Sequence, residues 1–119
     1  MANEITLSSM LSFLKGGRQD EFGEFGQELT MNGTDYVRAT QTIGTSAEAL
    51  AIGDIGTCGL IAIKNKDATN YVTIRAGSGG TDLVKLKPGE CFPFRLATNT
   101  PYAIANTAPV EIEYLLLED

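Results

Sequence analysis

Residues 59–74 read GLIAIKNKDATNYVTI, and two apolar runs there flank the polar stretch from Asn65 to Asn70. The first run is apolar on both of its faces, which is typical of a strand in the middle of a sheet. The second run alternates, with Val72 and Ile74 on one side and Thr73 on the other. Asn and Asp residues in the connector favour turns. The stretch therefore predicts a β-hairpin, and it contains no pattern typical of a catalytic site.

The same two-residue alternation recurs along most of the chain, whereas the 3.6-residue period of amphipathic helices is nearly absent. In the C-terminal segment the apolar face consists of Val110, Ile112, Tyr114 and Leu116. About eight to ten short strands predict an all-β fold, a jelly-roll-like antiparallel β-sandwich, because one sheet could not cover its own apolar face. We expect TSAE, residues 45–48, to form a short strand or a turn.

Glycine and proline residues mark the expected turns. Asn32-Gly33 is a strong hairpin signal, and Pro88-Gly89 fits the centre of a type II turn in a further hairpin. The first strand is expected to end at Gly16-Gly17. Its predicted face consists of Ile5, Leu7, Leu11 and Phe13. Because no linker or repeat divides the chain, we expect one domain over residues 1–119, in which residues 1–35 are either outer strands or an N-terminal arm.

The chain is acidic, with a formal net charge of −6, and its nine basic residues are scattered. Nucleic-acid binding needs clustered Lys and Arg, so we expect no nucleic-acid partner. No run approaches the roughly 20 apolar residues that cross a bilayer, so we expect no membrane partner either. The first residues, MANEITLSSM, lack the positive charges of a signal peptide. We expect a soluble protein that folds in a cytoplasm.

The chain has no histidine, which removes Ser-His-Asp catalysis, Cys-His catalysis and the usual imidazole metal sites. We therefore expect no enzyme and no cofactor, although a carboxylate pair of the glycosidase type is not excluded by residue type. Asp20, Glu21, Glu24 and Glu28 lie close in sequence and could hold calcium. Their spacing matches no EF-hand, so a solvated acidic loop is the favoured interpretation and no metal site is assigned.

The two cysteines, Cys58 and Cys91, match neither a metal-ligand spacing nor a disulfide-rich scaffold. Two reduced thiols are expected, and a disulfide between them is left open. The glycines of GSGG, residues 77–80, lack the lysine and the strand-to-helix context of a phosphate loop. We therefore interpret them as turn residues.

Two sets of side chains are candidates for binding. Tyr36, Tyr71 and Tyr102 fall near predicted strand starts and could stack on sugars at one rim of the sandwich, or could be ordinary amphipathic edge residues. Apolar residues also occupy faces that the alternation assigns to solvent, which often marks a subunit contact. These candidate oligomer or capsid contacts are Met10, Leu14, Leu115 and Leu117. The alternative is that a second sheet or a loop covers them.

Four segments together suggest a family: QTIGTSAEALAIGDIGT (41–57), GLIAIKNKDATNYVTI (59–74), LKPGECFPFRLA (86–97) and PYAIANTAPVEIEYLLLED (101–119). Their order and wording resemble small virion structural proteins of tailed bacteriophages, from about residue 36 to the end. The resemblance implies a non-enzymatic decoration or cement protein, made in the host cytoplasm, that binds the major capsid protein as a homotrimer on the capsid exterior. The competing hypothesis is a receptor- or carbohydrate-binding module of a phage fibre or a cellular protein.

Overall fold

A computed structural model describes residues 3–119, which contain ten β-strands and no helix. The predicted all-β fold and the predicted number of strands are confirmed. Contacts divide the chain into two compact units, one ending at Asn32 and the other comprising Gly33–Asp119. The first unit is a hairpin and the second is a sandwich, and each is described by itself below.

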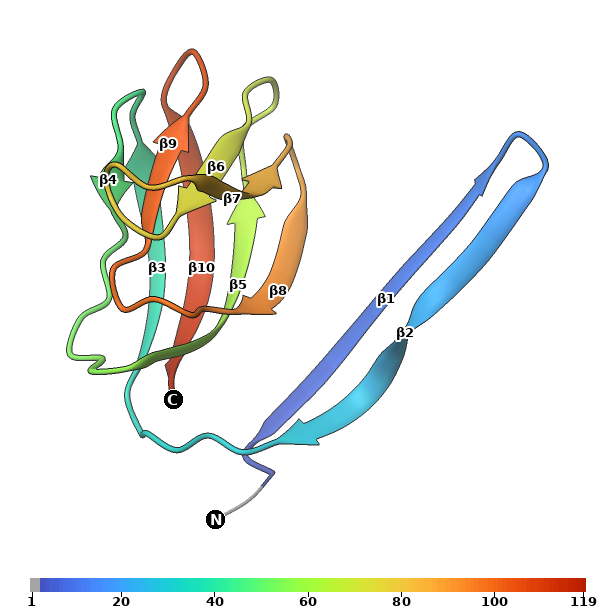
Figure 1. Cartoon of the computed structure of the whole chain (residues 1–119), viewed down its shortest axis with the longest axis horizontal. Helices are drawn as coiled ribbons and strands as arrows, with labels where there is room; N and C mark the ends of the chain where they lie inside the picture. Colours follow the sequence, from blue (N-terminus) through green and yellow to red (C-terminus); the bar gives the residue numbers. More distant parts are fainter. Residues whose placement is uncertain (1–2) are drawn as a thin grey trace. The chain divides into compact units, whose positions relative to one another are not determined.

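The hairpin consists of β1 (Ile5–Lys15) and β2 (Arg18–Leu29), which pair antiparallel along their length (Figure 1). Gly16 and Gly17 form the two-residue turn with φ angles of 59° and 75°. Positive φ at both positions is what a type I′ hairpin turn requires, and it explains why two glycines stand there. An irregularity in the pairing lies between Leu7 and Ser9, opposite Gly26, whose φ is 67°. The Gly26 N–H donates to Ser8 Oγ at 2.8 Å.

The sandwich contains two antiparallel four-stranded sheets. The first sheet has the order β3 (Tyr36–Ile43), β10 (Val110–Glu118), β5 (Cys58–Asn65) and β8 (Cys91–Arg95). The second sheet has the order β4 (Glu48–Ala49), β9 (Tyr102–Ala105), β6 (Val72–Arg75) and β7 (Asp82–Leu86). The sheets lie face to face in Figure 1.

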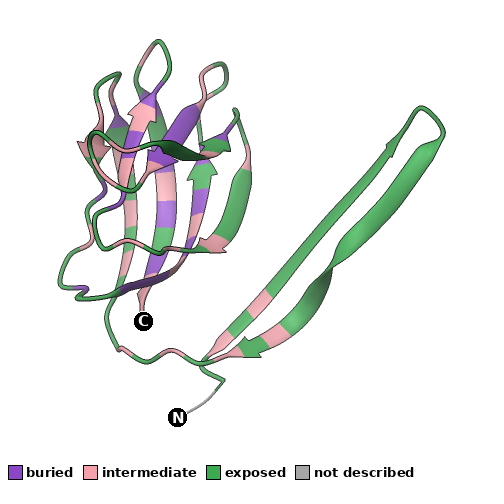
Figure 2. Ribbon diagram, viewed as in Figure 1, coloured by how far each residue is buried: buried purple, intermediate pink, exposed green. Residues whose placement is uncertain are grey.

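The apolar core lies between these sheets. The alternation predicted for the C-terminal strand is confirmed, because Val110, Ile112, Tyr114 and Leu116 of β10 are all buried. Side chains from the second sheet, among them Val72, Ile74, Leu86 and Ala103, close the core from the other side. In Figure 2 the buried residues are confined to the sandwich, and most of the hairpin is exposed. β5 is central in its sheet, as predicted.

Several predicted hairpins are wrong. β5 belongs to the first sheet and β6 to the second, so the connector in residues 59–74 crosses between sheets. The connector that contains Pro88-Gly89 crosses in the same way, from β7 to β8. A hairpin and a crossing loop both bury alternate residues, and alternation therefore does not distinguish them. The 45–48 segment leads into the short strand β4, as expected, and Glu48 accepts a hydrogen bond from the Gly44 N–H.

Asn32-Gly33 does not form a hairpin turn either, since β2 pairs with β1 and not with β3. A Cβ atom at Gly33 would lie 2.3 Å from Oε1 of Glu118. A larger residue at this position would therefore require the Glu118 side chain to move.

Candidate interaction surfaces

One face of the hairpin carries a group of apolar side chains near its turn. Residues that pair directly across two strands point to the same face. Leu11 pairs with Phe22, and Phe13, two residues further along, lies on their side. Leu11 is 74% exposed and Phe22 86% exposed, and Phe13 is also exposed. We call Leu11, Phe13 and Phe22 the aromatic face.

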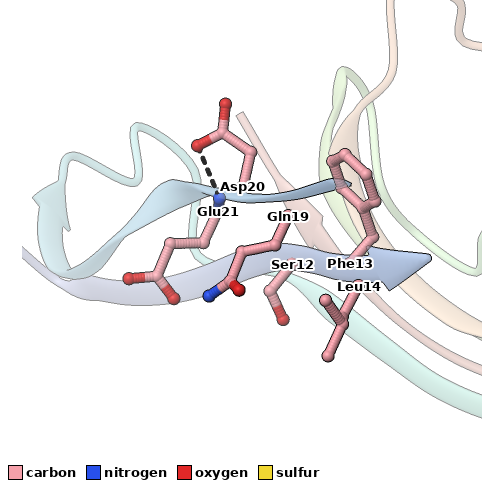
Figure 3. A pocket seen from close by; sticks show the side chains of 6 residues that line it. All are labelled: Ser12, Phe13, Leu14, Gln19, Asp20 and Glu21. Carbon is pink, nitrogen blue, oxygen red and sulfur yellow. Dashed lines mark hydrogen bonds between the residues drawn. The ribbon is translucent and has the colours of Figure 1, made fainter. Parts of the chain in front are cut away.

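The opposite face of the hairpin carries two of the predicted contact residues. Met10 and Leu14 are four residues apart on β1, so they share this face, and both are exposed. Figure 3 shows Phe13 on one side of the ribbon and Leu14 on the other. The pocket shown in Figure 3 is lined only by residues of β1 and β2, among them Gln19 and Asp20. It is open to solvent within the hairpin unit, because this unit contains no further strand that could close it. The hairpin is therefore apolar on both faces.

Such a hairpin is incomplete by itself. An isolated two-stranded hairpin is marginally stable at best in water, and an apolar patch on a protein surface often marks an interaction site. The exposed fractions of the three side chains of the aromatic face, 74%, 54% and 86%, together equal about two fully exposed side chains. Covering the aromatic face would therefore contribute about 3 to 6 kcal/mol, since fully burying one such side chain contributes about 1.5 to 3 kcal/mol. The hairpin is thus a surface that a partner would stabilise.

The other two predicted contacts lie on the outer face of the first sheet. Leu115 pairs with Arg38 and Ala62, and it is exposed, so neither the second sheet nor a loop covers it. Leu117 is half-buried next to Tyr36. Met10 and Leu14 belong to the hairpin and Leu115 and Leu117 to the sandwich. The four residues therefore do not form one patch within either unit.

An ion pair accompanies Leu115 on this face. Arg38 Nη2 lies 2.8 Å from Glu113 Oε2. The hydrogen bond from Arg38, together with its charge, lowers the pKa of the Glu113 carboxyl. Both side chains are accessible to water, so the pair contributes little to stability and leaves Leu115 in a charged surrounding.

Sequence reasoning missed an apolar groove at one edge of the sandwich, between β7 of the second sheet and β8 of the first. Its volume is about 350 Å³. The apolar residues that line it include Ile74, Leu83, Val84, Phe94 and Leu96. Leu83, at the irregular pairing of β7 with β6, is 64% exposed. No sequence pattern shows which edges of two sheets lie next to each other, so the groove could not be predicted.

Basic side chains border this groove. Arg75 and Arg95 line it, and each also has an acidic partner. Arg75 Nε lies 2.5 Å from Asp82 Oδ1, and Arg95 Nη1 lies 3.5 Å from Asp119 Oδ1. Both pairs are at least partly exposed, so the groove keeps guanidinium groups within reach of a ligand or partner.

The tyrosines do not form the predicted rim. Tyr102 pairs with Arg75 at one end of β6, whereas Tyr71 immediately precedes Val72 at the other end. Lys85 Nζ lies 4.0 Å from the centre of the Tyr71 ring, which places a cation over that ring. The interpretation of the tyrosines as a sugar platform on one rim is therefore wrong for Tyr71 and Tyr102.

The acidic residues from Asp20 to Glu28 lie on strand β2, so the predicted acidic loop is wrong. Their cross-strand partners are spread from Phe13 to Thr6, along most of the hairpin. Within residues 3–119 no three His, Cys, Asp or Glu side chains come together in a way that could hold a metal ion. Cys58 and Cys91 are both free, and burial raises the pKa of the Cys58 thiol.

Glu118 fastens the start of the sandwich. Its carboxylate accepts hydrogen bonds from the backbone N–H groups of Gly56, Asp35 and Thr34 at 2.9 to 3.2 Å. These bonds lower the pKa of the Glu118 carboxyl. The segment that precedes β3 is thereby held to the last strand, and the sandwich begins at a defined place in the chain.

Comparison with known proteins finds no matching protein family, no similar curated protein and no similar solved structure. The described part of the chain contains no helix that is long and apolar enough to cross a membrane. Function is therefore inferred from the surfaces described above.

Proposed function

We propose that this chain is a non-enzymatic virion structural protein of a tailed bacteriophage, a decoration or cement protein that binds the capsid exterior and stabilises it. The observation that carries the proposal is the hairpin, which exposes apolar side chains on both faces. In an assembly, neighbouring subunits would cover these exposed apolar side chains. Many symmetry-related copies add their binding energies, so each contact can be modest.

The strand order of the sandwich supports the proposal. We interpret it as a jelly roll, because the successive strands β3 to β10 alternate between the two sheets except at β6 and β7, and because β3 and β10 are neighbours. Jelly rolls recur in viral capsid proteins and in lectins. This interpretation fits a virion protein and also keeps a lectin-like module as the competing function.

In the proposed assembly the hairpin and the sandwich make different contacts. Met10 and Leu14 are the candidate capsid contacts, and Leu115 and Leu117 are the candidate contacts between sandwiches of a homotrimer. Residues 1–32 contain five acidic and two basic side chains, and residues 33–119 contain ten and seven. Each unit thus has a formal charge of −3, which favours a basic docking surface on the capsid.

Co-sedimentation with mature capsids of the encoding phage tests the proposal. The wild-type chain at micromolar concentration should pellet with capsids and remain in the supernatant without them. Leu14→Glu should pellet several-fold less, because it places a charge on the contact, whereas Leu14→Met keeps an apolar side chain and should pellet like the wild type. Equal recovery of all three chains in the supernatant would reject the decoration function.

The competing function, a receptor- or carbohydrate-binding module, has less support from the side chains. Tyr71 and Tyr102 lie at opposite ends of β6, and Lys85 lies over the Tyr71 ring. Oligosaccharide binding would change the tyrosine fluorescence or raise the midpoint of thermal unfolding. A saturable change of either kind, with no capsid binding, would favour this function over decoration.

A further inference from the structure

Two strands of the sandwich have an open edge next to the apolar groove. β7 and β8 are the last strands of their sheets, and neither has a second neighbour among the described strands. An open edge presents N–H and C=O groups that can pair with another chain. The groove between them adds apolar walls, and Leu83 lies exposed at its rim. This side of the sandwich therefore offers both the hydrogen bonds and the apolar surface that an added β-ribbon needs.

The aromatic face of the hairpin is a ribbon surface of matching chemistry. Leu11 and Phe22 form a cross-strand pair, and Phe13 extends the apolar surface along β1. All three side chains are exposed, as is Leu83 in the groove. Within its own unit the apolar hairpin has no second layer, and within the sandwich no described residue fills the groove.

Charge favours the groove over a second hairpin as the partner of the aromatic face. The hairpin has four acidic side chains on β2, namely Asp20, Glu21, Glu24 and Glu28. Lys15 and Arg18 next to the turn offset part of this charge, so residues 1–32 have a formal charge of −3, and two packed hairpins would repel one another. Two basic residues, Arg75 of β6 and Arg95 of β8, in contrast, line the groove. Both guanidinium groups are at least partly exposed beside their partners Asp82 and Asp119. Opposite charges steer and orient such a contact.

We propose that the hairpin of one copy docks with its aromatic face in the groove between β7 and β8 of a second copy. The contact is head to tail, because it joins two different surfaces. Repetition of a head-to-tail contact closes a ring when the rotation between copies allows it and otherwise builds a filament. The inference requires no capsid and stands independently of the decoration function.

Cross-linking tests which surfaces meet. In a Cys91→Ser background, Phe22→Cys is made in one chain and Leu83→Cys in another, and the two chains are mixed under mild oxidation. The mixture should form a disulfide-linked heterodimer in several-fold greater yield than a mixture of Phe22→Cys with Asp54→Cys. Asp54 is an exposed loop residue remote from the groove in sequence and serves as the matched control.

Complementation tests the direction of the contact. Phe22→Glu damages the hairpin surface and leaves the groove intact, whereas Leu83→Glu damages the groove and leaves the hairpin intact. All chains in this test also carry Leu115→Asp, which removes the proposed contact between sandwiches. Each variant alone should then be monomeric by light scattering at concentrations where the Leu115→Asp chain associates. Mixed together, they should form a dimer and nothing larger, because only one intact contact is possible per pair. Phe22→Leu should associate like the Leu115→Asp chain.

At concentrations where every chain is monomeric, all variants should unfold at the wild-type urea midpoint, since the altered side chains are exposed. It is overturned by a wild type that is monomeric at every concentration, by a heterodimer yield equal to the Asp54 control, or by Phe22→Cys homodimers as the main product. An intrachain disulfide in dilute Phe22→Cys/Leu83→Cys chain, with no heterodimer in the mixture, would place the hairpin in its own groove and would also overturn it. None of these outcomes bears on capsid binding.

Discussion

Replacement of Asn65 by aspartate should destabilise the sandwich strongly, although the two side chains have nearly the same shape. Asn65 is the last residue of β5 and is fully buried. Its amide nitrogen donates to the backbone carbonyls of Asn70 and Leu86, both at 3.0 Å, and its Oδ1 accepts from the Asp67 N–H at 2.8 Å. The side chain thereby joins the connector after β5 to the end of β7.

The expected loss follows from these contacts. Aspartate keeps the acceptor for the Asp67 N–H but replaces the donating nitrogen with an oxygen. Two carbonyls then lose their donor and face a carboxyl oxygen, and each buried acceptor left unsatisfied costs about 1 to 3 kcal/mol. Ionisation of the carboxyl would add a further desolvation cost. We expect the free energy of unfolding to fall by about 3 kcal/mol or more.

Urea denaturation followed by tyrosine fluorescence measures this loss. The chain has no tryptophan, and all four tyrosines belong to residues 33–119, so the signal reports on the sandwich alone. Asn99→Asp is the matched control, because only the Asn99 Oδ1 is used, as acceptor from the Cys58 N–H at 2.8 Å. The control should change the free energy of unfolding by no more than about 0.5 kcal/mol. Losses within about 1 kcal/mol of each other for the two variants would refute the assigned role of the Asn65 amide.

Three further predictions concern other contacts. Tyr114→Phe removes the hydroxyl that donates to the Ala51 carbonyl at 2.6 Å and should lower the free energy of unfolding by about 1 kcal/mol in the same urea assay; no change would mean that water replaces this bond without loss. The hydrogen bonds that lower the Glu118 pKa stabilise the fold fully above its ordinary pKa of 4.5, and this stabilisation is lost as the pH falls through the lowered value. The wild type should therefore be more stable than Glu118→Gln at neutral pH, and the difference should shrink on acidification; a constant difference would contradict the pKa assignment. Leu115→Asp or Leu117→Asp should give a soluble but smaller species by light scattering, and an unchanged mass would remove these leucines from the trimer contact.

The sheet class and the core could be predicted because they depend on local alternation. In β10 every second residue from Val110 to Leu116 is buried, and the sequence shows that period directly. β5 could be placed at the centre of a sheet because both of its faces begin apolar. These inferences need only the two-residue period of a strand and the preference of apolar side chains for the interior.

Strand partners could not be predicted in the same way. The connectors after β5 and β7 contain ordinary turn residues, yet both cross between sheets. The amide of Asn65 bonds to the carbonyl of Asn70 within the first connector and to Leu86 at the start of the second. This cross-link stabilises two neighbouring crossings at once. It depends on two segments that lie 21 residues apart in the chain, which no local pattern specifies.

In the hairpin, the alternation of apolar residues does not predict which side chains are buried. The alternation of β1 assigned Leu11 and Phe13 to a buried face and Met10 and Leu14 to solvent, but all four side chains are exposed. A strand with this pattern requires a second layer, and residues 3–32 contain only the two paired strands. The pattern of Leu11 and Phe13 therefore matches a layer that the hairpin does not contain. An alternating strand outside any core is a signal for an interface, and it directs attention to another molecule as the missing layer.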